Sequence, residues 1–159
     1  MKRKLIYFLG TFFFSGSAPR ARGTIGTAVP ALMIWLVDMH LHWPWWWTLL
    51  AAGIVLILGT PLASAASTKE DPDPSWFVVD EVAGMLITIA GQVALTGAPL
   101  NVAILVAFIT FRGFDIIKPQ PIGWVDKKIK GGIGVMLDDV LAAVYAWILT
   151  YAILYVYML

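Results

Sequence analysis

The chain has 159 residues, of which 60% are hydrophobic and only 13% are charged. A soluble domain holds about 45–50% apolar and about 25% charged residues, and a fold of this size has too little interior to bury the excess apolar surface. This composition argues against a disordered chain, a fibrous repeat and an ordinary soluble enzyme, and it predicts that residues 1–159 form a single integral membrane domain. Because cysteine is absent, disulfides, thiolate metal sites and a cysteine nucleophile are excluded.

The chain begins with three basic residues, Lys2, Arg3 and Lys4, followed by an apolar run over residues 5–14. This pattern is similar to a signal peptide, but the apolar run is short and no small-residue cleavage site follows it. We therefore expect a retained amphipathic segment that lies in the membrane interface.

Five later segments approach the length of about 20 apolar residues that a membrane-spanning helix requires. Gly97-Ala98-Pro99 predicts a tight turn between the third and the fourth segment. These two segments reach spanning length only if they extend into charged stretches, from about residue 75 and to about residue 117. The predicted fold is an all-α polytopic membrane bundle, and its five segments are residues 24–41, 45–63, 82–96, 100–111 and 140–158.

The basic residues are distributed unevenly along this predicted topology. With five spans, all eleven Lys and Arg residues fall on one side of the membrane, which the positive-inside rule makes the cytoplasmic side. Four tryptophans, Trp43, Trp45, Trp46 and Trp47, fall at the opposite interface. We interpret them as an aromatic belt that anchors the bundle.

Nine of the ten acidic residues share the basic side, and Asp38 is the exception. Acids at the edge of a span tend to face a polar cavity or the bundle interior, where carboxylates and a substrate phosphate are suitable ligands for Mg²⁺. Asp80 and Glu81 open one predicted helix, and Gly84 lies on their face of that helix. The alternative is that these acids only stabilise a helix N-terminus.

Arg112, Asp115 and Lys118 follow each other at intervals of three residues, and Pro119 then ends the helix. Two cations beside a carboxylate suit a site that binds a metal and a phosphate together. An ion-pair ladder along one helix is an equally good interpretation of this spacing.

Two glycine-rich stretches complete the candidate site. Residues 131–134 form a connector that leads Asp138 and Asp139 into the start of the last span, where they can act as ligands or simply cap the helix. Residues 23–27 contain a Gly-Thr repeat, which carries Thr24 and Thr27, at the start of the first span. Small residues before a helix are typical of an anion-binding turn.

Two alternative mechanisms of phosphate chemistry, which use an aspartyl-phosphate or a phosphohistidine, fit the sequence less well than a metal and phosphate site. Residues 71–75 resemble the Asp-x-Asp-x-Thr pattern of aspartyl-phosphate enzymes, but no buried strand precedes them, and we interpret the match as chance. A phosphohistidine mechanism fails because His40 and His42 fall on the side away from the acids.

Taken together, four stretches resemble the phosphatidylglycerophosphatase A family in order and spacing. Ala18 and Arg22 depart from the family pattern, which usually has Ser and Pro there. The resemblance implies a bacterial inner-membrane, Mg²⁺-dependent phosphatase that converts phosphatidylglycerophosphate to phosphatidylglycerol. The four stretches are residues 23–27 (GTIGT), 79–85 (VDEVAGM), 111–122 (FRGFDIIKPQPI) and 130–139 (KGGIGVMLDD).

These inferences give one hypothesis for the site. Carboxylates hold Mg²⁺ or position the attacking water, and polar residues bind the phosphate. The proposed metal ligands are Asp80, Glu81, Asp115, Asp138 and Asp139, with Asp80, Glu81, Asp115 and Asp139 also catalytic; the phosphate-binding residues are Arg112, Lys118, Thr24 and Thr27.

The expected partners are the phospholipid substrate and the bilayer, with no nucleic acid, and the site is expected to face the cytoplasm. Two alternatives remain at this point. The first is a phosphatase of another lipid phosphomonoester, and the second is a non-catalytic ion or lipid carrier with an acidic ring. Attack by water and attack by a carboxylate are both compatible with the sequence.

Overall fold

The computed structural model describes residues 2–41 and 44–159, and helices account for nearly all of the regular structure. No strand occurs within these two described ranges, which confirms the all-α prediction. In chain order the elements are α1 (Lys2–Gly10), the 3₁₀ turn η1 (Ser15–Ser17), α2 (Arg22–Leu41), α3 (Trp47–Ala66), α4 (Val79–Ile89), α5 (Gln92–Thr96), α6 (Leu100–Ile117), α7 (Ile122–Lys128) and α8 (Gly132–Tyr157).

Within residues 2–41 and 44–159, five helical segments are long and apolar enough to cross a membrane, which confirms the predicted number. They are α2, α3, the α4–α5 pair, α6 and α8, and each has between 18 and 26 residues. At 1.5 Å per residue, even 18 residues extend about 27 Å, close to the thickness of the hydrocarbon core. The extension to residue 117 is confirmed, whereas the third span begins at Val79 and not at residue 75.

The last span begins at Gly132, eight residues before its predicted start at residue 140. The prediction of a glycine-rich connector was therefore wrong for Gly132 and Gly134, which lie inside α8. A Cβ on Gly132 would collide with the carbonyl oxygen of Thr60 and with the side chain of Ser64 in α3. These glycines allow close approach of the backbone, and the helix begins early because it packs against its neighbours.

The third span is interrupted at Gly91, which has a positive φ of 72° and separates α4 from α5. The interruption frees the carbonyl of Ala90, and the indole Nε1 of Trp147 donates a hydrogen bond to it at 2.7 Å. The amide of Gln92 donates to the carbonyl of Trp147 at 3.0 Å. The break is therefore tolerated at membrane depth because side chains satisfy the backbone groups that it exposes.

The α4–α5 segment is the centre of the bundle. Two thirds of it (67%) is buried inside the protein, against 17–28% for the other four spans, and α4 packs against α2, α3, α6 and α8. Small residues let the helices approach closely: Gly84 faces the ring of Phe111 at a distance that leaves no room for a Cβ. A central α4 means that acids in its first turn are enclosed by the surrounding helices.

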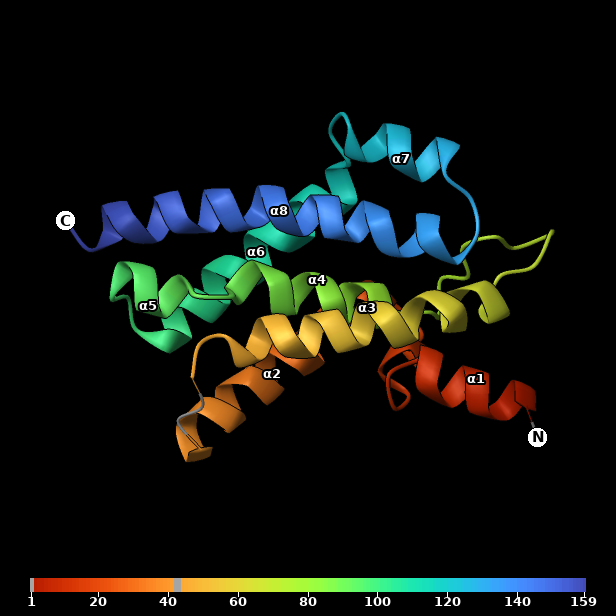
Figure 1. Cartoon of the computed structure of the whole chain (residues 1–159), viewed down its shortest axis with the longest axis horizontal. Helices are drawn as coiled ribbons and strands as arrows, with labels where there is room; N and C mark the ends of the chain where they lie inside the picture. The colour runs from red at the N-terminus through yellow and green to blue at the C-terminus, as the bar shows by residue number, and fades with distance from the viewer. Residues whose placement is uncertain (1, 42–43) are drawn as a thin grey trace.

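The two ends of the bundle differ in what they carry (Figure 1). The connection between α3 and α4, the start of α8, and helices α1 and α7 lie toward one end, whereas α5, the C-terminus and the C-terminal end of α2 lie at the other. Lys and Arg residues belong to elements of the first end, and the exposed Trp45 and Trp46 lie at the second. His42 and Trp43 lie outside the described residues. Which end faces the cytoplasm stays a prediction.

Candidate active site

A polar cavity of about 460 Å³ opens at the end of the bundle that carries the basic residues. Its walls come from the segment before α2, the connection between α3 and α4, the first turns of α4 and α8, and the end of α6. All five carboxylates that the sequence proposed as ligands line it, together with Lys118. The charged and hydroxyl-bearing residues of the lining are Arg20, Arg22, Asp73, Ser75, Asp80, Glu81, Asp115, Lys118, Asp138 and Asp139.

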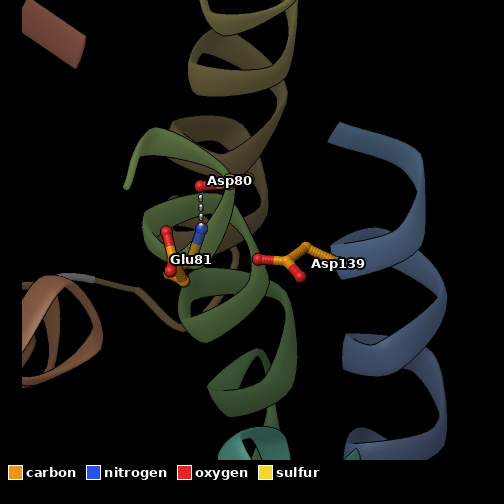
Figure 2. A group of neighbouring side chains, drawn as sticks. All are labelled: Asp80, Glu81 and Asp139. Carbon is orange, nitrogen blue, oxygen red and sulfur yellow. Dashed lines mark hydrogen bonds between the residues drawn. The ribbon is translucent and has the colours of Figure 1, made fainter. Parts of the chain in front are cut away.

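Three of these carboxylates form a compact cluster, which we call the acidic triad: Asp80, Glu81 and Asp139 (Figure 2). Asp80 and Glu81 come from the first turn of α4, and Asp139 reaches them from α8. One oxygen of each lies within 4.8 Å of the other two. Asp80 is 8% exposed and Asp139 is 4% exposed, so the triad is nearly enclosed.

The hydrogen bonds of the acidic triad are incomplete. Asp80 accepts a hydrogen bond from the backbone N–H of Glu81 at 3.0 Å. Among the described residues, however, the buried Oε2 of Glu81 and Oδ2 of Asp139 have no partner. Buried carboxylates that close repel one another, and a hard divalent cation is the ligand that an all-oxygen set favours. The residues present therefore fit a divalent metal site, while the identity of the metal stays a proposal.

Arg112 connects Asp115 to the acidic triad. Its Nη1 forms an ion pair with Asp115 one turn along α6 and lies 3.9 Å from Oε1 of Glu81. All three side chains are only 13–14% exposed, and Arg112 does not line the cavity. The ion-pair interpretation therefore describes Arg112 and Asp115 well. A Cβ on Gly23 would lie 2.5 Å from Oε1 of Glu81, so the start of α2 packs directly on this ion pair.

Lys118 does not continue the helical face of Arg112 and Asp115. It leaves α6 in the left-handed conformation, with φ 44°, and its Nζ donates to Asp126 at 2.7 Å and to Asp138 at 2.6 Å. Burial lowers the pKa of Lys118, but these two hydrogen bonds raise it by more, and the pKa lies above its ordinary value. The ammonium group is therefore charged at neutral pH and joins α6, α7 and α8 at the cavity.

Helix capping does not explain Asp138 and Asp139. Asp138 and Asp139 are the seventh and eighth residues of α8, whose N-cap is Gly131. The prediction that they open the last span was therefore wrong. Asp80 and Glu81, by contrast, lie in the first turn of α4 behind the N-cap Val78, where the helix N-terminus favours their negative charge.

The structure also separates the two predicted threonines from the cavity. Neither Thr24 nor Thr27 lines it, and the buried Thr27 donates its hydroxyl to the carbonyl of Gly23 at 2.8 Å. Arg20 and Arg22, from the segment before α2 and from its first residue, line the cavity instead.

Asp73 is the carboxylate of the lining that sequence analysis missed. The signal was present, because Asp73 lies only seven residues before Asp80. The stretch does not fit the aspartyl-phosphate pattern, which requires a strand, but it belongs to the same run of acids as Asp80 and Glu81.

Comparison with known proteins then decides the family. The family model described as Phosphatidylglycerophosphatase A matches residues 8–154. The chain belongs to the phosphatidylglycerophosphatase A family. This confirms the resemblance inferred from the four motifs, all of which lie inside the matched range.

Three relatives cover most of the chain. A Phosphatidylglycerophosphatase A of Haemophilus influenzae is 34% identical, over 94% of this chain and 89% of its own length. One of Escherichia coli is 34% identical, over 87% and 77%. A Bacteroides thetaiotaomicron protein named "Putative phosphatidylinositol-3-phosphatase" is 38% identical, over 94% of both chains. No solved structure matches this chain.

Membership of this family shows that the chain is a phosphatase, which confirms the predicted enzyme class. A carrier that only passes ions or lipids is therefore not the function of this fold. The relatives are bacterial and the chain has five candidate spans, as expected of a bacterial membrane enzyme.

Proposed function

We propose that this protein hydrolyses the terminal phosphomonoester of phosphatidylglycerophosphate, giving phosphatidylglycerol and inorganic phosphate in phospholipid synthesis. The observation that carries the proposal is the acidic triad, which lies in a polar cavity at one end of a membrane bundle. A lipid headgroup at the bilayer surface can enter such a cavity while its acyl chains remain in the membrane. We further propose that residues 1–159 act as one lipid-phosphatase domain.

The first group of site residues is the acidic triad with the two residues that form ion pairs beside it. Asp80, Glu81 and Asp139 would hold a divalent cation, for which we propose Mg²⁺, and the cation would supply the positive charge that lets a phosphate approach carboxylates. Arg112 holds Asp115 and Glu81 in place through its ion pairs. Asp115 faces the cavity, where its carboxylate can accept a proton from the attacking water.

Lys118, which also lines the cavity, holds Asp138 at 2.6 Å and presents a charged ammonium to the substrate phosphate. In the reaction the water oxygen bonds to phosphorus and the P–O bond to glycerol breaks. The proton that Asp115 takes from the water is then available for the leaving alkoxide. Positive charge from Lys118 would stabilise the equatorial oxygens of the phosphoryl group during this step. The roles first assigned to Thr24 and Thr27 stay predictions.

We also propose that the cavity faces the cytoplasm of a bacterial inner membrane. The support is the gathering of the Lys and Arg residues at the cavity end of the bundle, together with the positive-inside rule.

A second candidate substrate is phosphatidylinositol 3-phosphate. It is favoured by the 38% identical relative from Bacteroides thetaiotaomicron, whose name refers to that activity. Both lipids carry a phosphomonoester on a headgroup that a phosphodiester joins to diacylglycerol.

Phosphate release by purified protein in neutral detergent micelles tests the proposal. We expect release from phosphatidylglycerophosphate when Mg²⁺ is added, and none in excess chelator. Asp38→Asn is the control, because Asp38 lies in the last turn of α2, away from the cavity. Full activity in chelator would contradict the metal assignment, and release only from phosphatidylinositol 3-phosphate would replace the proposed substrate with the second candidate.

A further inference from the structure

Two arginines of the cavity are not used by the proposed chemistry. Arg20 and Arg22 both line the cavity. Arg20 lies just before α2, and Arg22 is the first residue of that helix. Among residues 2–41 and 44–159, neither forms an ion pair, whereas Arg112 and Lys118 each contact two carboxylates. Within the described part of the chain, the cavity therefore has two cations that are not ion-paired with a carboxylate, although carboxylates line other parts of the same cavity.

Arg22 is held in position without its charge being satisfied. Its Nε donates to the carbonyl of Ala18 at 3.0 Å, and its Nη1 donates to the hydroxyl of Ser75 at 2.6 Å. Both acceptors are neutral, and a guanidinium has five N–H donors, so donors on Nη1 and Nη2 remain for a ligand. Ser75 also lines the cavity. A fixed, half-buried guanidinium with spare donors loses little side-chain entropy when it binds an anion.

The arginines lie next to the acidic triad without entering it. Gly23, which follows Arg22, packs directly against Glu81, since a Cβ there would lie 2.5 Å from Oε1. An anion bound by Arg20 and Arg22 is therefore a neighbour of the phosphate that the triad and Lys118 would hold. Both arginines also lie at the end of a spanning helix, the depth at which lipid phosphodiesters are found in a bilayer.

We infer that Arg20 and Arg22 form a second phosphate subsite, which binds the phosphodiester of a lipid whose phosphomonoester lies at the acidic triad. This inference rests on the proposed function and extends it to substrate selection. The ligand class is a phospholipid with both a diester and a monoester phosphate. Arginine suits this role because its planar donors pair with two oxygens of one phosphate. Phosphatidic acid, which has a monoester but no diester, gains nothing from such a subsite.

The test compares the double variant Arg20→Gln/Arg22→Gln with wild type in micelles of uncharged detergent, so that attraction to an anionic bilayer plays no part. We expect the KM for phosphatidylglycerophosphate to rise about tenfold, which corresponds to about 1.4 kcal/mol of binding free energy, with kcat within threefold. The KM for phosphatidic acid should change less than twofold. If phosphatidic acid is not hydrolysed, its inhibition constant is measured instead and should also change less than twofold. Phosphatidylinositol 3-phosphate, measured alongside, shows which diester-bearing headgroup the subsite prefers.

The matched control is Arg3→Gln/Lys4→Gln, which removes the same charge from exposed positions of α1 outside the cavity and should leave both lipids unaffected. Among the described residues Arg20 forms no hydrogen bond or ion pair that Arg20→Gln would break. This single variant should raise KM for the diester lipid about threefold even where the Arg22 variant folds poorly. An equal effect on phosphatidic acid, or an equal effect of the control variant, overturns the subsite. Wild type that hydrolyses no lipid phosphate overturns the proposed function itself.

Discussion

Replacing Asp139 by Asn separates a metal site from a structural cluster more sharply than an activity measurement alone. Asp139 is 4% exposed, and its Oδ2 has no partner among the described residues. Asn keeps the shape and one carbonyl oxygen but removes the charge. In a cluster built to hold a cation, this change should stabilise the metal-free protein and at the same time lower its affinity for the metal.

The magnitude follows from the spacing of the acidic triad. The three oxygens lie within 4.8 Å of one another, and two unit charges at that upper limit repel by about 3.5 kcal/mol at an effective dielectric constant of about 20. Removing one of these charges relieves part of this repulsion, and we therefore expect Asp139→Asn to raise the free energy of unfolding by about 1–3 kcal/mol in excess chelator. A metal at 100 times its dissociation constant stabilises the native state by about 2.7 kcal/mol. Wild type should gain this amount and the variant should not.

Denaturant titration in detergent micelles, followed by the fluorescence of the eight tryptophans, measures both effects. Without metal the variant should unfold at a higher denaturant concentration than wild type, and saturating Mg²⁺ should remove or reverse this difference. Asp38→Asn, at the other end of the bundle, should respond to Mg²⁺ as wild type does. A variant that is less stable than wild type by the same amount with and without Mg²⁺ would show that Asp139 is a structural residue, and the reasoning would be refuted.

Three further predictions concern other parts of the molecule. Asp80→Asn should lower turnover by at least about 100-fold while the protein remains folded in membranes, since an amide cannot replace the charge of a metal ligand; unchanged phosphate release would remove Asp80 from the site. Gly84→Ala should lower the free energy of unfolding by about 1–3 kcal/mol, because its Cβ would collide with the ring of Phe111. No change in the same denaturant titration would mean that α6 shifts away from α4 at little energetic cost. Because the chain has no cysteine of its own, single cysteines at Lys69 or Lys127 can be labelled specifically. An impermeant reagent should not reach them in intact cells, and labelling there would reverse the proposed orientation.

The sequence by itself determined the number of spans and most of their positions. A hydrophobic stretch must form a helix to cross a bilayer because every backbone polar group needs a partner there, and this constraint acts within each segment. It is the reason that α2 and α6 were predicted to within a few residues. The acids at the helix ends were equally visible, because a carboxylate near a span is costly and is retained for a reason.

Only the tertiary structure decided which of these residues meet. Asp139 joins Asp80 and Glu81 because α8 packs beside α4, and Lys118 joins Asp138 and Asp126 because the chain turns out of α6. Arg22 and Ser75 are 53 positions apart, yet they share one hydrogen bond and one cavity. Local periodicity contains no information on such pairs, since they depend on how closely neighbouring helices approach. A small residue on one helix determines how closely a neighbouring helix can pack, and the sequence around that residue does not identify the neighbour.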